Sequence, residues 1–243
     1  MGKLSGKVAL ITGASAGIGH AAALALASEG ADLVVTARRQ ERLEGLAAAA
    51  AKAGVKTVCV PGDMTEEATA KAAVEAAIKT FGRIDILIAN AGVGNYKNLV
   101  DTSVAEYDAM MDGNMKSTWL ITRHTVPVMT AQKDGLILLV SSMAGVYGFA
   151  GEATYCATKF AQVGFAQGLD KELRPHGIKV GTINPGGVKT EFAIGKGRTE
   201  EGVAASEMLE AEDVAAAILF AATQPKLARI IQIQMRTMAE SLT

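Results

Sequence analysis

The chain has 243 residues and a formal net charge of −1, and 49% of its residues are hydrophobic while 20% are charged. This composition supplies apolar material for a core and excludes the disordered class, while the absence of charge blocks or of a long apolar run argues against nucleic-acid partners and membrane spans. Two cysteines and three scattered histidines lack metal-ligand spacing, so we expect no metal site and a single cytoplasmic domain over residues 1–243.

The chain begins with a predicted strand, turn and helix. Residues 7–12 form a short apolar run, and residues 17–30 are alanine-rich and end in a glycine. The turn between them carries Gly13, Gly17 and Gly19, a GxxxGxG spacing in place of the general GxGxxG dinucleotide fingerprint. Glycine lets the backbone approach a pyrophosphate, and a helix N-terminus offers free amides. We therefore favour a phosphate-bearing cofactor here over a glycine-capped surface turn.

A second predicted strand, residues 32–37, runs into Arg38 and Arg39. Folds that prefer NAD usually carry an acid at the end of this strand to hold the ribose 2′-hydroxyl. Two guanidinium groups stand there instead, and their geometry matches a phosphate. The pattern predicts NADP(H) in preference to NAD(H), with a solvated basic turn as the alternative.

Strands and helices continue to alternate along the chain. Such alternation is typical of parallel strands joined by right-handed crossovers. We predict a Rossmann-like α/β fold, a doubly wound sheet of about seven parallel strands with helices on both faces. The further strands are expected at residues 55–60, 84–89, 136–140, 178–183 and 230–235. The further helices are expected to end at about 53 and then to span 65–82, 104–132, 152–174 and 211–223.

Two irregularities in this pattern suggest function. The helical pattern of residues 104–132 is expected to break near Gly113, and Asn114 at the break competes for backbone hydrogen bonds. Taken alone, Asn114 fits the alternative of a capping asparagine on a solvent face. The segment from about 187 to 210 is polar and dotted with glycine. Long irregular loops of this kind are commonly lids or substrate walls.

Ser142, Tyr155 and Lys159 form a candidate proton-transfer site. Tyr155 and Lys159 are four residues apart, so they share one face of a helix. A lysine ammonium there is expected to lower the tyrosine pKa toward working pH and so make the phenol a general acid or base. Ser142 follows the apolar run 136–140 and is expected at the carboxyl end of a strand, where open α/β sheets place their ligands. The alternative is an ordinary half-exposed helix pair.

Together these motifs resemble the short-chain dehydrogenase/reductase family over residues 7 to about 235. The matching segments are residues 12–19 (TGASAGIG), 90–92 (NAG), 155–159 (YxxxK) and 184–186 (NPG), with Asn114 and Ser142 between them. Ala89 departs from the family, which often has a second asparagine there. The order and spacing of all these matches agree with the family.

The resemblance implies roles for individual residues. Ser142 would hydrogen-bond the substrate carbonyl, Tyr155 would transfer the proton, and Lys159 would hold the nicotinamide ribose. Asn114 would anchor a water that relays protons to Lys159. The implied cofactor-binding residues are Gly13, Ser15, Gly17, Ile18, Gly19, Arg38, Arg39, Asp63, Met64, Asn90, Ala91, Gly92, Tyr155, Lys159, Pro185, Gly186, Val188 and Thr190.

By this resemblance, the expected activity is an NADPH-dependent transfer of hydride between nicotinamide and a ketone or aldehyde, or the reverse reaction on a secondary alcohol. A 3-oxoacyl-[acyl-carrier-protein] reductase is the alternative, although residues 230–238 lack the glycine-rich ending usual in those members. A non-catalytic NADP-sensing protein is a second alternative. The family also implies a homo-oligomer, most often a tetramer. A mostly apolar substrate pocket is expected from Val93, Asn95, Met143, Val146, Tyr147 and Phe192.

Overall fold

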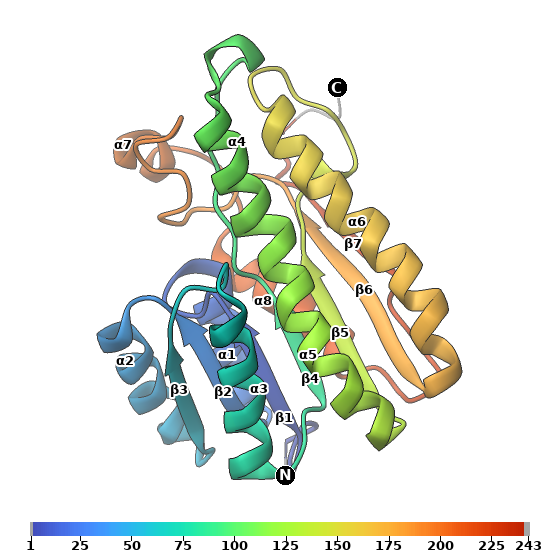
Figure 1. Cartoon of the computed structure of the whole chain (residues 1–243). Helices are drawn as coiled ribbons and strands as arrows, with labels where there is room; N and C mark the ends of the chain where they lie inside the picture. Colours follow the sequence, from blue (N-terminus) through green and yellow to red (C-terminus); the bar gives the residue numbers. More distant parts are fainter. Residues whose placement is uncertain (1, 241–243) are drawn as a thin grey trace.

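Seven parallel strands form one sheet in the computed structural model, which describes residues 2–240. The strand order is β3-β2-β1-β4-β5-β6-β7 (Figure 1), and every neighbouring pair is parallel. The chain therefore starts in the middle of the sheet, builds one half outward to β3, and then crosses to build the other. The predicted doubly wound sheet is confirmed. The strands are β1 (Val8–Thr12), β2 (Asp32–Ala37), β3 (Thr57–Pro61), β4 (Ile86–Ala89), β5 (Gly135–Val140), β6 (Ile178–Pro185) and β7 (Gln232–Met235).

Helices cover both faces of this sheet. Figure 1 shows α3 (Glu67–Phe81), α5 (Ser117–Gln132) and α6 (Ala153–Leu173) in front of the strands. The opposite face is covered by α1 (Gly17–Ser28), α2 (Gln40–Ala50) and α8 (Ala211–Ala222). The shorter helices are α4 (Val104–Met110), α7 (Glu200–Ala204), η1 (Ala51–Ala53), η2 (Leu99–Asp101), η3 (Met111–Lys116), η4 (Met143–Gly145) and η5 (Arg174–His176).

The alternation of side chains along each strand divides the core in two. In β1, Ala9 and Ile11 pack with α1, α2 and α8, whereas Val8 and Leu10 pack with α3, α5 and α6. Because both faces are covered, all five residues of β1 are buried and read as a continuous apolar run. The strands can therefore be predicted from the sequence as short apolar runs.

The main departure from the predicted elements lies in residues 104–132. The break expected near Gly113 is a π-helical turn, η3, which joins α4 to α5. Single π-turns inside helices are frequent at functional sites. Smaller differences are that β3 runs to Pro61 and β6 to Pro185, and that the irregular segment after β6 contains the short helix α7.

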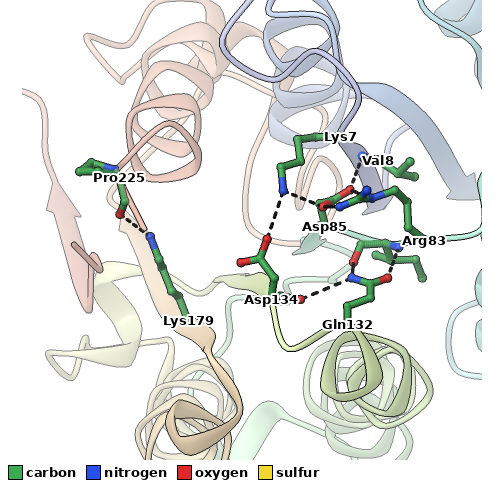
Figure 2. Close-up of polar contacts among 9 residues, drawn as sticks. Lys7, Val8, Arg83, Asp85, Gln132, Asp134, Lys179 and Pro225 are labelled. Atoms are coloured by element: carbon green, nitrogen blue, oxygen red, sulfur yellow. Dashed lines mark hydrogen bonds and ion pairs between the residues drawn. The ribbon is translucent and has the colours of Figure 1, made fainter. Parts of the chain in front are cut away.

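A polar cluster ties together the amino ends of β1, β4 and β5 (Figure 2). The Asp85 carboxylate, 3% exposed, accepts hydrogen bonds from Lys7 Nζ at 2.9 Å and Arg83 Nη2 at 2.6 Å, and from the Val8 amide at 2.9 Å. Gln132 Nε2 donates to Ile84 O at 2.8 Å, and the Ile84 amide donates back to Gln132 Oε1 at 3.0 Å. These bonds satisfy buried polar groups at the sheet edge opposite the predicted site.

Candidate active site

The glycine turn after β1 is locked to the turn after β4. Thr12 Oγ1 accepts hydrogen bonds from the amides of Asn90 at 3.0 Å and Ala91 at 2.9 Å. A methyl group at Gly19 would lie 2.5 Å from both Gly13 O and Asn90 Nδ2, closer than real Cβ atoms come. The packing of these two turns therefore requires glycine at position 19 and fixes the shape of the cleft above them.

A large cavity of about 1360 Å³ runs along the carboxyl ends of the strands. Open α/β sheets bind their ligands at this edge. Two predicted site residues do not line it: Gly19 lies beneath the glycine turn, and Asn114 is buried behind the wall. The predicted residues that line it are Gly13, Ser15, Gly17, Ile18, Arg38, Arg39, Asp63, Met64, Asn90, Ala91, Gly92, Ser142, Tyr155, Lys159, Pro185, Gly186, Val188 and Thr190.

Ser142 and Tyr155 meet at one end of this cavity. Ser142 begins η4, where its Oγ accepts the Ala144 amide at 3.1 Å and donates to Pro185 O at 3.4 Å. The Tyr155 ring, 5% exposed, packs edge-on against Tyr96 with 5.5 Å between ring centroids. The Ser142 hydroxyl lies near enough to the phenol to influence its pKa. The strand end and the helix thus present two hydroxyl groups to the same part of the cavity.

Burial shifts the pKa values of Tyr155 and Lys159, which both lie on α6. It raises the pKa of the Tyr155 phenol, and the nearby Ser142 hydroxyl offsets this only in part. Burial also lowers the pKa of Lys159 to about 7. The expected fall of the tyrosine pKa toward working pH is wrong for this structure, because burial is the largest influence on the phenol. Lys159 Nζ lies 5.7 Å from the ring centroid and donates to Val140 O and Gln162 Oε1. The phenol is therefore held neutral.

Asn114 lies in the π-turn η3 and is fully buried against α6. Its Oδ1 accepts the Val93 amide at 2.7 Å, and its Nδ2 donates to Thr158 Oγ1 at 2.9 Å. Its backbone oxygen accepts Gln162 Nε2 at 3.0 Å and Thr118 Oγ1 at 2.7 Å. Asn114 thus reaches Lys159 through the Gln162 amide.

The basic end of the cavity lies where β2 ends. Arg39 Nη2 donates to Ser15 Oγ in the glycine turn at 3.1 Å, and Arg39 Nη1 pairs with Glu191 at 2.8 Å. Arg42 pairs with the other oxygen of Glu191 at 2.5 Å. Glu191 belongs to the irregular segment after β6, so these ion pairs connect that segment to the opposite side of the cleft. At Asp63, the hydrogen bond from the Thr65 amide, helped by the charge of Arg38, holds the carboxyl pKa below its usual range.

Comparisons with known proteins agree with this geometry. The short chain dehydrogenase family model matches residues 7–201. This chain belongs to the short-chain dehydrogenases. It is 36% identical over 233 residues to an uncharacterized oxidoreductase of Staphylococcus aureus (strain USA300), covering 96% of this chain and 98% of that protein. It is therefore an oxidoreductase by family.

Solved structures of other proteins superimpose over nearly the whole chain. An alcohol dehydrogenase from Thermococcus sibiricus, complexed with 5-hydroxy-NADP, is 27% identical with a TM-score of 0.89, covering 98% of this chain and 99% of that one. The 3-ketoacyl-(acyl-carrier-protein) reductase from Brucella melitensis, complexed with NADH, is 31% identical with a TM-score of 0.84, covering 96% and 98%. Structural relatives therefore include both NADP and NAD complexes.

The end of the cavity around Ser142 and Tyr155 is more polar in this short-chain dehydrogenase than the sequence suggested. Val93, Met143 and Phe192 line the cavity as expected. Asn95 lines a separate cavity of about 300 Å³, and Val146 and Tyr147 lie outside the lining that the described residues form. The residues missed from the sequence are Tyr96, Glu152, Arg198, Arg236 and Glu240. They come from four separate segments that meet only in the fold, since Arg236 and Glu240 are four residues apart, so no local pattern could have pointed to the set.

Between residues 2 and 240, no helix is long and apolar enough to cross a membrane. The same part of this short-chain dehydrogenase has no group of three or more histidine, cysteine, aspartate or glutamate side chains placed to hold a metal ion.

Proposed function

We propose that this short-chain dehydrogenase is an NADPH-dependent oxidoreductase that interconverts a ketone or aldehyde and the corresponding alcohol. The observation that carries the proposal is that Ser142 and Tyr155 open into the same cavity as the glycine turn. A proton donor and a dinucleotide cradle in one cavity are the two parts that hydride transfer to a carbonyl needs.

The residues around the cavity fit a nicotinamide dinucleotide. The glycine turn has its backbone exposed at the N-terminus of α1, which suits a pyrophosphate. Arg38 and Arg39 line the end of the cavity beyond β2, where the 2′-phosphate that distinguishes NADP from NAD would bind. Thr190, on the opposite wall, is expected near the nicotinamide end. When bound, the reduced cofactor supplies the hydride for the carbonyl carbon.

Residues of the protein then bind and protonate the carbonyl oxygen of the substrate. Ser142 donates a hydrogen bond to this oxygen, and Tyr155 donates the phenolic proton to it as the alcohol forms. Since burial raises the Tyr155 pKa, the phenol carries its proton at neutral pH and is ready to act as the acid. Lys159 provides the positive charge that stabilises the phenolate left behind. The segment 187–210 forms the outer wall of the substrate pocket.

The test is oxidation of NADPH and of NADH, followed by absorbance, with a panel of ketones and aldehydes, a β-ketoester and an acyl thioester. The proposal expects turnover with free carbonyl compounds and faster turnover with NADPH. Activity confined to the thioester would favour the acyl-carrier reductase, to which the similarity with the Brucella protein also points. NADPH binding without turnover would favour a sensing protein.

We also propose a homotetramer that buries the outer faces of α4, α5 and α6. Large apolar side chains are exposed there: Tyr107 on α4 is 46% exposed, Trp119 on α5 is 43% exposed and Phe160 on α6 is 45% exposed. Large apolar side chains exposed on several helices are suited to an interaction surface. Light scattering after size-exclusion chromatography tests the assembly, and a monomeric mass would contradict it.

A further inference from the structure

Gln162 connects the buried lysine of the site to the π-turn. It lies one helical turn after Lys159 on α6 and is fully buried. Its Oε1 accepts a hydrogen bond from Lys159 Nζ at 3.0 Å. Its Nε2 donates to the backbone oxygen of Asn114 at 3.0 Å and to Thr118 Oγ1 at 2.7 Å. One side-chain amide therefore bridges three elements: α6, η3 and α5.

The orientation of this amide is fixed by its partners. A backbone carbonyl can only accept hydrogen bonds, and an ammonium can only donate them. The amide nitrogen must therefore face Asn114 O, and the amide oxygen must face Lys159. Flipping the amide would set two donors against each other at Lys159 and two acceptors against each other at Asn114. Gln162 thus offers Lys159 an acceptor that cannot turn away.

Lys159 depends on few acceptors for its charge. Lys159 is 4% exposed, and its ammonium donates hydrogen bonds to Val140 O at 3.1 Å and to Gln162 Oε1. Among residues 2–240, the titratable group placed against it is Tyr155, on its own helix. Across the residues described here, burial is the cause that lowers its pKa, and no carboxylate of η3, η4, β5 or β6 offsets it. Two neutral oxygens therefore sustain a buried positive charge.

We infer that Gln162 is a positioning residue for the Lys159 ammonium: it keeps this group protonated and leaves its remaining N–H for the cavity. The inference deepens and rests on the proposed function, in which the charge of Lys159 stabilises the Tyr155 phenolate. Without Gln162, Lys159 would retain Val140 O as its acceptor in the described structure, while Asn114 O would retain Thr118. Removing Gln162 would therefore reduce the protonation of Lys159 more than it would destabilise the fold.

The experiment is an NMR titration of protein labelled with ¹³Cε-lysine, in which the Lys159 signal is assigned by its loss in Lys159→Met. In Gln162→Met, which keeps the side-chain length and removes the amide, we expect the Lys159 pKa to fall by about one to two units. In Gln162→Glu, which places a carboxylate against the ammonium, we expect it to rise above the wild-type value. Circular dichroism verifies that each variant is folded.

Thr118→Val is the matched control, because it removes a partner of the Gln162 nitrogen and leaves the bond to Lys159 in place. The inference expects an unchanged Lys159 pKa in this variant. Equal Lys159 titrations in wild type and Gln162→Met would overturn it, as would a fall in Thr118→Val as large as that in Gln162→Met.

Because the titration needs no substrate, its outcome is separate from that of the proposed function. If wild-type protein turns over no carbonyl compound, the proposed function fails whatever the lysine does. With a substrate in hand, Gln162→Met should also move the acid limb of the alcohol-oxidation pH profile upward, since the Tyr155 phenolate would then form beside a weaker positive charge. A purely structural role for Gln162 would lower the rate without moving that limb.

Discussion

Replacing Asp85 by alanine should destabilise the protein without touching the candidate active site. The Asp85 carboxylate accepts hydrogen bonds from Lys7, from Nε and Nη2 of Arg83 and from the Val8 amide, all at the amino edge of the sheet (Figure 2). The cavity lies at the opposite edge, along the carboxyl ends of the strands. The substitution therefore separates stability from function.

The size of the destabilisation depends on which hydrogen-bond partners of Asp85 can be hydrated by water once the carboxylate is gone. Removing the carboxylate leaves the Val8 amide buried without its acceptor, which costs about 1–3 kcal/mol. The Lys7 and Arg83 side chains are 37% and 44% exposed, so water can replace part of what they lose. The total should therefore lie below the ~3–5 kcal/mol of a fully buried pair. We expect a loss of about 2–3 kcal/mol in the free energy of unfolding.

The assay is urea unfolding followed by circular dichroism, with all proteins at one concentration. Asp134→Ala is the control, because Asp134 also pairs with Lys7, at 3.2 Å, but its side chain is 43% exposed. This exposed pair should contribute less than about 1 kcal/mol. If Asp85→Ala proved no less stable than Asp134→Ala, the reasoning from burial would be refuted.

The same carboxylate makes stability depend on pH. Burial alone would raise the Asp85 pKa, but the hydrogen bonds from Arg83, Lys7 and Val8 outweigh it and hold the pKa below its usual range. A lowered folded pKa gives stability that is fully present above the unfolded pKa of about 3.9 and is lost as the pH falls through the folded pKa. The stability difference between wild type and Asp85→Ala should therefore narrow below about pH 4.

Three further variants test the site. Tyr155→Phe should lower turnover by about 10²- to 10⁴-fold and retain NADPH binding in calorimetry; retained turnover would remove Tyr155 from the proton transfer. Arg38→Asp should shift the ratio of kcat/KM values toward NADH, since a carboxylate repels the 2′-phosphate and can hold the ribose 2′-hydroxyl; an unchanged ratio would contradict the role of Arg38. Glu191→Gln should free Arg39 from its ion pair and raise NADPH affinity by up to about 5-fold, with NADH affinity unchanged; equal effects on both cofactors would contradict the competition.

The sequence alone was sufficient to predict the fold and to bring most of the predicted site residues to one cavity. Strands buried on both faces appear as short apolar runs, such as residues 136–140, and these alternate with helical patterns. Ser142, Tyr155 and the glycine turn follow strand ends or begin helices, so parallel topology brings them to one edge. Local pattern and topology together were enough to predict that these groups share a site.

What only the tertiary structure decided are the contacts between distant segments and the burial of charged groups. Glu191 reaches Arg39 across 152 positions of sequence, and Gln162 reaches Asn114 across 48. Neither contact produces a periodic pattern in the sequence, because each depends on how a loop or a helix packs against the sheet. The sequence placed Lys159 one turn from Tyr155 and so predicted a lowered tyrosine pKa. The packed site holds that pKa high, because the desolvation of a buried phenol depends on everything around it and not on spacing along one helix.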